Sequence, residues 1–172
     1  MRTLVLGGSR SGKSGYAEAL LSHELAVVYV ATGRADPADA EWTARIAAHR
    51  ARRPASWSTV ETGDLAAELV GDGPALLADS VTTWLARAMD DCGAWTDGPA
   101  GRLAERVDEL VAAWSGARRR AVLVSDEVGL SVVPESASGR LFRDVLGGLN
   151  QRLAAAADEV VLVVAGLPLR LR

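Results

Sequence analysis

A glycine-rich segment near the amino terminus has the residue types and spacing of a phosphate-binding loop. The segment consists of Gly7, Gly8, Ser9, Arg10, Ser11, Gly12, Lys13 and Ser14. It fits the pattern G-x-x-x-x-G-K-[ST], in which backbone N–H groups surround the phosphates of a nucleotide. Lys13 is the only lysine of the chain, although lysine and arginine together number 19. A compact ammonium reaches the β- and γ-phosphate oxygens, and a serine hydroxyl binds Mg²⁺. We therefore expect Lys13 to be catalytic, the segment to bind nucleotide, and Ser14 to bind the metal.

The flanking residues predict the local structure that such a loop needs. Residues 3–6 form a short apolar run typical of a buried strand, and apolar residues at helical spacing follow between 14 and 24. A loop between a strand and a helix places free N–H groups and the positive end of the helix dipole against an anion. This context disfavours the alternative of a chance glycine- and serine-rich turn.

Apolar runs alternate with helical patterns along the rest of the chain. Strands are expected at 26–31, 57–61, 75–78, 121–125, 160–164 and 167–171, the last at an edge, and helices at 39–52, 81–89, 101–114 and 137–157. Residues 90–99 are polar and glycine-rich, so we expect a mobile loop there. The alternation predicts an α/β fold of the P-loop NTPase type, with a mostly parallel central sheet between helices on both faces. A single nucleotide-binding domain, residues 1–172, suits this length.

Acidic residues follow two of the expected strands, at the edge of the sheet where ligands bind in such folds. Asp79 closes the strand at 75–78. It is placed either to hold Mg²⁺, directly or through water, or to cap the following helix, and the spacing favours neither role. Asp126 and Glu127 close the strand at 121–125 in the same way. They are either a metal site with an activating carboxylate or a pair that stabilises a turn.

The chain has two histidines, of which one lies in a strongly basic context. His23 falls near the end of the first expected helix, where interaction with the helix dipole is the simpler role. His49 lies among arginines, including Arg50 and Arg53. A neutral imidazole is a competent nucleophile toward phosphorus, and arginines stabilise the charge that builds on the oxygens. On composition alone, a solvated basic helix face remains the preferred alternative.

Bulk properties narrow the function classes. A net charge of −3 argues against a general nucleic-acid binder, and no apolar run approaches the length of a membrane span. Cys92 is the only cysteine, so no internal disulfide forms, and a strand beginning within three residues of the start leaves no room for a signal peptide. We expect a cytoplasmic protein. A small-molecule kinase fits this length, whereas a guanine-reading Asn-Lys-x-Asp segment would need a second lysine.

Short motifs spread over the chain accompany the phosphate-binding loop. They are Tyr29-Val30-Ala31-Thr32, Arg45-Ile46, His49-Arg50, Arg53-Pro54, Trp57, Thr59, Glu61, Asp79, Thr82, Trp84, Glu127-Val128-Gly129, Val133-Pro134-Glu135, Phe142-Arg143-Asp144, Leu149-Asn150-Gln151, Ala157-Asp158 and Gly166-Leu167-Pro168. In this combination the chain resembles the bifunctional adenosylcobinamide kinase/adenosylcobinamide-phosphate guanylyltransferase family of cobalamin biosynthesis. The resemblance covers essentially the full length.

The resemblance implies two reactions and a set of site residues. A nucleoside triphosphate, ATP or GTP, phosphorylates the aminopropanol hydroxyl of adenosylcobinamide. GTP then transfers GMP through an enzyme histidine to adenosylcobinamide phosphate, and the matching histidine is His49, which reverses the preference drawn from composition. The resemblance also implies Mg²⁺, a homotrimer with sites near subunit boundaries, and nucleotide contacts from Thr32, Arg50, Arg53, Glu61 and Asp79, with Asp79 and Ser14 at the metal.

Four positions depart from the family pattern as we expect it. Asp126 stands where asparagine is usual, Ser131 replaces a glycine, Arg87 replaces an asparagine and Ser80 replaces a frequent cysteine. Two other interpretations stay open. One is a P-loop small-molecule kinase that performs only the first reaction, with His49 idle, and the other is a non-catalytic NTP-binding module.

Overall fold

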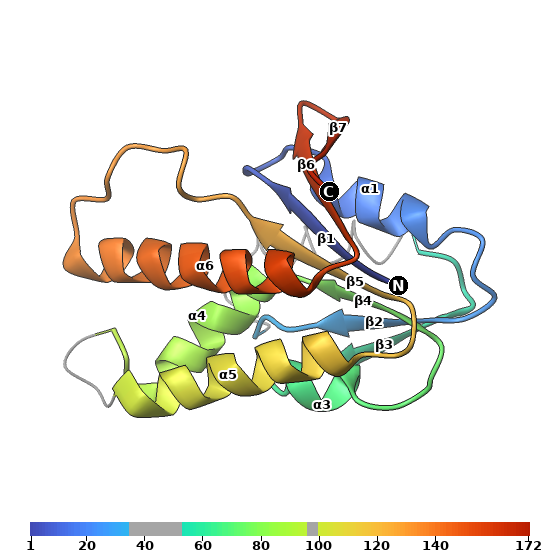
Figure 1. Ribbon diagram of the computed structural model, residues 1–172, viewed down its shortest axis with the longest axis horizontal. Helices are drawn as coiled ribbons and strands as arrows, with labels where there is room; N and C mark the ends of the chain where they lie inside the picture. The colour runs from blue at the N-terminus through green and yellow to red at the C-terminus, as the bar shows by residue number, and fades with distance from the viewer. Residues whose placement is uncertain (35–52, 96–99) are drawn as a thin grey trace.

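The computed structural model describes residues 1–34, 53–95 and 100–172. Seven strands in these ranges form one sheet with the order β3-β2-β4-β5-β1-β6-β7 (Figure 1). The strands are β1 (Arg2–Gly7), β2 (Val27–Ala31), β3 (Trp57–Glu61), β4 (Ala75–Asp79), β5 (Ala121–Asp126), β6 (Glu159–Val164) and β7 (Leu167–Arg170). Each pairs in parallel with its neighbours except β7, which runs antiparallel to β6 at the edge. The expected mostly parallel sheet with a final edge strand is confirmed.

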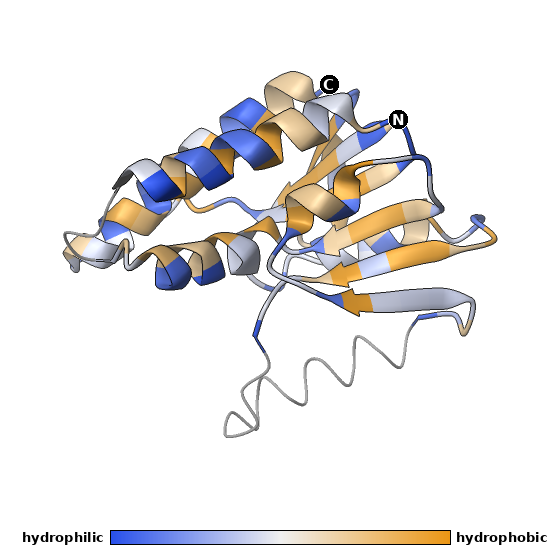
Figure 2. Ribbon diagram, turned by 90° about the horizontal axis from the view of Figure 1, so that it is seen from below, coloured by the Kyte–Doolittle hydropathy of each residue, from blue (hydrophilic) through white to orange (hydrophobic). Residues whose placement is uncertain are grey.

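Helices cover both faces of the sheet (Figures 1 and 2). On one face lies α1 (Lys13–Leu20), and on the other lie α3 (Leu65–Leu69), α4 (Val81–Cys92), α5 (Ala100–Gly116) and α6 (Ala137–Ala156). Each face has its own apolar cluster: Ala17 and Leu21 pack with β1, β2 and β5 on the first, while Trp84 and Trp114 belong to the larger second cluster. Because the central strands are buried on both sides, they are apolar throughout. The expected three-layer α/β fold is confirmed.

Helices α4 and α3 differ from the sequence prediction. Helix α4 extends to Cys92, so the predicted loop at 90–99 was wrong at its start, and the helix ends where Gly93 adopts a φ of 63°. Gly93 caps the helix in the left-handed conformation that glycine adopts easily. Helix α3 was not predicted, because a single short turn carries no periodic signal; Asp64 begins it by accepting a hydrogen bond from the Ala67 amide. The helix expected at 39–52 lies outside the described residues.

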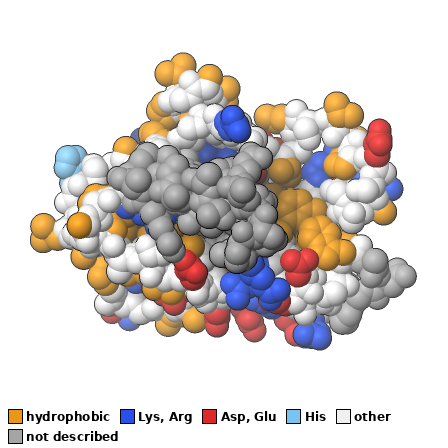
Figure 3. Space-filling view, turned by 180° about the vertical axis from the view of Figure 1, so that it is seen from behind, with side chains coloured by type: hydrophobic (Ala, Val, Ile, Leu, Met, Phe, Trp, Pro, Cys, Tyr) orange, Lys and Arg blue, Asp and Glu red, His pale blue; other side chains and the backbone are white. Residues whose placement is uncertain are grey.

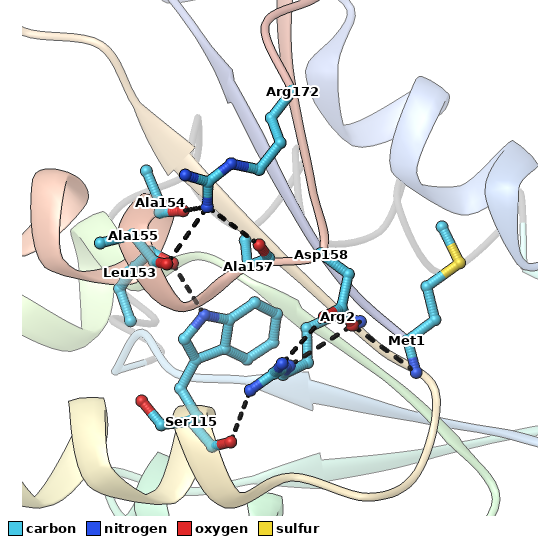
Figure 4. Close-up of polar contacts among 10 residues, drawn as sticks. Met1, Arg2, Ser115, Leu153, Ala154, Ala155, Ala157, Asp158 and Arg172 are labelled. Carbon is cyan, nitrogen blue, oxygen red and sulfur yellow. Dashed lines mark hydrogen bonds and ion pairs between the residues drawn. The ribbon is translucent and has the colours of Figure 1, made fainter.

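Both chain termini are anchored at the amino edge of the sheet, opposite the phosphate-binding loop (Figure 4). Asp158 accepts hydrogen bonds from the Arg2 amide at 2.6 Å and from its guanidinium at 2.8 Å. These bonds lower the pKa of Asp158 to about 2, and the bond from the Arg2 side chain has the larger effect. Arg172 donates to the terminal carbonyls of α6 at Ala154, Ala155 and Ala157. It thereby gives hydrogen-bond partners to carbonyls at the end of the helix, where intrahelical donors run out. Within the described ranges, none of the helices has the length and apolar character needed to cross a bilayer.

Candidate functional site: the phosphate-binding loop

The glycine-rich segment forms a tight loop between the carboxyl end of β1 and the first turn of α1. The Ser11 amide donates to the Gly8 carbonyl at 3.2 Å, and the Ser11 carbonyl accepts from the Gly166 amide at 2.8 Å. Arg10 and Gly12 have positive φ values of 56° and 93°. Left-handed residues alternate with right-handed ones in the backbone turns that bind anions through successive N–H groups, and these two positions fit that pattern. The structure therefore gives the predicted segment the shape of a phosphate cradle.

Two glycines of the loop are required by its geometry. A Cβ atom on Gly7 would lie against Ser11 Oγ and 2.7 Å from the Val163 carbonyl oxygen. A Cβ atom on Gly12 would lie 3.2 Å from Gly166 Cα, and its φ of 93° is strained for any residue with a side chain. The loop thus sits directly against the turn between β6 and β7, with no space for side chains at these positions.

Lys13 is paired with Asp126. Its Nζ lies 2.6 Å from Asp126 Oδ1 and donates to the Gly8 carbonyl at 3.1 Å. The two side chains are 12% and 27% exposed, so solvent screens the pair only in part. The pairing follows from the sheet, because the parallel register of β1 and β5 places Gly7 beside Asp126. A residue far from the loop in sequence is therefore part of the site.

The backbone of Asp126 is fixed by hydrogen bonds from two helices. Its amide donates to Thr82 Oγ1 at 2.9 Å, and its carbonyl accepts from Asn150 Nδ2 at 3.0 Å. The next residue, Glu127, donates its amide to the Gly7 carbonyl at 3.1 Å and accepts from the Gly129 amide at 2.6 Å. Glu127 therefore stabilises the turn, which was one of the two roles predicted for the Asp126–Glu127 pair. Asp126 instead faces the loop lysine.

Asp79 ends β4, two strands from β1 on the same edge of the sheet. The helix-cap alternative for Asp79 was wrong, because Ser80 is the N-cap of α4 and its hydroxyl accepts from the Thr83 amide. Behind Asp79 lies Tyr29, which is 3% exposed. Burial raises the pKa of Tyr29 far above its usual value, and the negative charge of Asp79 adds to this. Asp79 thus stands at the carboxyl edge of the sheet without a role as the cap of α4.

The other predicted nucleotide contacts lie at the carboxyl ends of β2 and β3. Thr32 is fully buried, donating to the Ser80 carbonyl at 2.6 Å and sharing a hydrogen bond with Thr83 Oγ1 at 2.7 Å. The Arg53 guanidinium carbon lies 3.3 Å from the centroid of the Tyr29 ring, a cation–π contact. Glu61, exposed, ends β3. A direct nucleotide contact from any of them stays a prediction.

The structure therefore gathers the sequence candidates into two groups along one edge. One group holds the loop with Asp126, and the other holds Asp79, Tyr29 and Arg53. His49 and Arg50 lie outside the described residues, so their predicted roles stay predictions. Thr82, Asn150 and Gly166 had no predicted role, yet they hold Asp126 and the loop through hydrogen bonds. Their only signal was that each belongs to a motif of the family resemblance.

The side chains at this edge suit a magnesium ion. Ser14, in the first turn of α1, offers a hydroxyl, and Asp79 and Asp126 offer carboxylate oxygens. Mg²⁺ prefers oxygen ligands, usually one or two carboxylates together with substrate phosphates. In residues 1–34, 53–95 and 100–172, no three His, Cys, Asp or Glu side chains come together as a metal-binding group. The fit therefore rests on the chemistry of the donors.

A phosphate-binding loop between the first strand of a parallel sheet and its helix defines a P-loop nucleotide-binding protein. Solved structures show the same fold. The chain is similar to a prototypical ATPase from the type III secretion system of pathogenic bacteria, with a TM-score of 0.60 and 14% identity over 98% of this chain and 56% of that one. The ATPase EscN of enteropathogenic E. coli is similar at a TM-score of 0.57 and 14% identity, over 95% and 43%. The chain thus spans about half of these ATPases.

Sequence comparisons are more specific. Residues 3–171 match the CobU family model, described as cobinamide kinase / cobinamide phosphate guanyltransferase. The bifunctional adenosylcobalamin biosynthesis protein CobU of Escherichia coli is 39% identical over 183 residues, covering 100% of both chains. The corresponding CobP of Pseudomonas aeruginosa is 43% identical over 178 residues, covering 100% of this chain and 98% of the relative. The chain belongs to the cobinamide kinase / cobinamide phosphate guanyltransferase family, and the resemblance found in the sequence is confirmed.

Proposed function

We propose that this protein phosphorylates adenosylcobinamide with a nucleoside triphosphate and then transfers GMP from GTP to the phosphorylated product, giving adenosylcobinamide-GDP. The observation that supports the proposal is the glycine-rich loop with Lys13, which joins β1 to α1 in a chain of this family. The proposal treats residues 1–172 as one nucleotide-binding domain that serves both steps.

In the kinase step the protein positions phosphates and neutralises charge. Loop N–H groups and Lys13 bind the β- and γ-phosphates, while the substrate hydroxyl attacks the γ-phosphorus, loses its proton, and displaces the nucleoside diphosphate. Ser14 and Asp79 would hold Mg²⁺, which when bound neutralises the charge of the phosphate oxygens. Preorganised donors stabilise the charge that builds up during transfer, the largest contribution in most enzymes of this kind.

In the guanylyl step His49 acts as the nucleophile. Its neutral ring nitrogen attacks the α-phosphorus of GTP, a P–N bond forms, and pyrophosphate leaves. A phosphate oxygen of the acceptor then attacks the same phosphorus and the P–N bond breaks, which regenerates the imidazole. Dividing the transfer into two displacements lowers each barrier. This assignment rests on the family match at His49 and on the arginines beside it in the sequence.

Incubation with α-labelled GTP and Mg²⁺ tests the proposal most directly. A covalent GMP adduct and exchange of labelled pyrophosphate into GTP are expected. ATP- or GTP-dependent phosphorylation without exchange would support a monofunctional small-molecule kinase. Nucleotide binding without either reaction would support a non-catalytic binding module.

We also propose a homo-oligomer, a trimer by family resemblance. Large apolar side chains are exposed on the segment after β5 and on the β6–β7 hairpin, among them Leu130, Val132, Leu167 and Leu169. Apolar side chains are also exposed among polar and charged groups on the back of the molecule (Figure 3). Exposed apolar surface of this kind often marks a protein interface. Sedimentation equilibrium measures the state, and a monomer at micromolar concentration would contradict this part of the proposal.

A further inference from the structure

We propose that Asp126 makes the phosphate-binding loop select a metal-bound polyphosphate over a metal-free one. The inference rests on the proposed function for the identity of the ligand, a nucleoside triphosphate. It assigns to Asp126 a specificity role that acts through charge and through Lys13, without contact to the reacting atoms.

The first step is the competition for Lys13. Its ammonium is held by Asp126 Oδ1 at 2.6 Å and by the Gly8 carbonyl at 3.1 Å. An ammonium has three N–H donors, so a lysine that binds a β- and a γ-phosphate oxygen and keeps its bond to the Gly8 carbonyl has none left for Asp126. Phosphate binding therefore breaks one ion pair to make another.

The second step is that the Asp126 backbone is fixed, so its carboxylate remains within the short reach of that side chain. Thr82 and Asn150 hold its amide and carbonyl, and the β1–β5 register holds it beside Gly7. Once Lys13 has turned to the phosphates, the carboxylate stays at the edge of the cradle as an uncompensated negative charge. Its side chain is only 27% exposed, so water screens it incompletely.

The third step concerns the charge of the ligand. A metal-free triphosphate brings several negative charges against the Asp126 carboxylate, and like charges at short range in a partly buried site repel strongly. The same phosphates carrying a divalent cation bring a positive charge that offsets the carboxylate. The repulsion from Asp126 therefore weakens the binding of metal-free ligands more than the binding of metal-bound ones.

Asparagine at this position removes the charge and keeps the shape. In Asp126→Asn both backbone hydrogen bonds remain, and the amide oxygen still accepts from Lys13. Glu127→Gln is the matched control, because it makes the same change of charge at the next residue, whose side chain bonds to the Gly129 amide instead of Lys13.

Equilibrium binding of GTP and of inorganic triphosphate, each in EDTA and in excess Mg²⁺, tests the inference. In EDTA, Asp126→Asn is expected to bind both ligands about fivefold more tightly than wild type, the scale of a partly exposed ion pair. In Mg²⁺ its affinity should change less, so that the preference for metal-bound ligand falls. Glu127→Gln should keep the wild-type preference.

Equal effects in both buffers, weaker binding in EDTA, or the same change in Glu127→Gln would each overturn the selectivity role of Asp126. A wild-type protein that binds neither ligand in either buffer would contradict the proposed nucleotide function itself. A normal wild-type affinity with an unaltered preference in Asp126→Asn would contradict only the inference about Asp126.

Discussion

The carbonyl oxygen of Ser11 accepts a hydrogen bond from the amide of Gly166 at 2.8 Å, which fastens the phosphate-binding loop to the turn between β6 and β7. The two segments are distant in sequence and meet because β6 pairs with β1 in the sheet. The contact leaves so little room that the loop depends on glycine at its closest point. The shape of the cradle is therefore set partly by a turn that contributes no ligand-binding side chain.

Gly12→Ala is expected to weaken nucleotide binding. The new Cβ would lie 3.2 Å from Gly166 Cα on a residue whose φ is 93°, which costs about 1–2 kcal/mol in the left-handed region. We expect a lower melting temperature and a larger Kd for GTP. Gly15→Ala is the control, because Gly15 lies in α1 and its Cβ would meet no atom within 4 Å. A Gly12→Ala protein with wild-type Kd and stability would contradict the geometry of the loop.

Lys13→Ala should abolish phosphoryl transfer, since no other lysine exists to replace it. Loss of a charged group that stabilises the transferred phosphoryl lowers kcat by about 100-fold or more. Lys13→Arg should also be poor, because a planar guanidinium is wider and more rigid than an ammonium. Steady-state phosphorylation of adenosylcobinamide measures both variants. Unchanged turnover in Lys13→Ala would remove the loop from the kinase mechanism.

Asp79→Asn and Ser80→Ala separate metal binding from helix capping at neighbouring positions. Asp79→Asn should raise the Mg²⁺ concentration needed for half-maximal activity, because a carboxylate ligand is lost. Ser80→Ala removes the cap of α4 and should lower the free energy of unfolding by about 1 kcal/mol, with the Mg²⁺ requirement unchanged. Magnesium titrations and thermal melts of both variants check this. If Asp79→Asn lowered the stability and left the Mg²⁺ requirement unchanged, Asp79 would act on the helix alone.

The Arg2–Asp158 contact predicts a pH-dependent part of the stability. The hydrogen bonds from Arg2 lower the pKa of Asp158 from 3.8 in the unfolded chain to about 2 in the folded one. The stabilisation is therefore complete above about pH 4 and is lost as the pH falls through about 2. Because the Asp158 side chain is 43% exposed, we expect Asp158→Asn to cost about 1 kcal/mol or less at pH 7. Urea unfolding at pH 7 and pH 3 should show the difference narrowing; a constant difference would contradict it.

The sequence predicted the loop and the strands because their signals are local. A glycine-lysine-serine pattern after an apolar run is complete within about a dozen residues, and each buried strand has its own apolar run. The pairing of Lys13 with Asp126 was beyond that reasoning, since it depends on β5 lying beside β1, a property of strand order. Spacing alone also left Asp79 with two possible roles, metal ligand or helix cap, and only the bond from the Thr83 amide to Ser80 showed that the cap is the next residue.

His49→Ala is expected to abolish covalent labelling by GTP and the guanylyl transfer, while phosphorylation of adenosylcobinamide survives in part. The kinase step needs only the loop, Mg²⁺ and a positioned hydroxyl, whereas the GMP intermediate needs the imidazole nitrogen. The adduct should be labile to acid and stable to base, as a P–N bond requires, and its formation should fail at acidic pH because a protonated imidazole has no lone pair to attack with. His23→Ala is the control, because it removes the other histidine, which is exposed beyond the end of α1. Mass spectrometry of the GTP-treated proteins locates the adduct. Its presence on another residue, or its persistence in His49→Ala, would remove His49 from the mechanism.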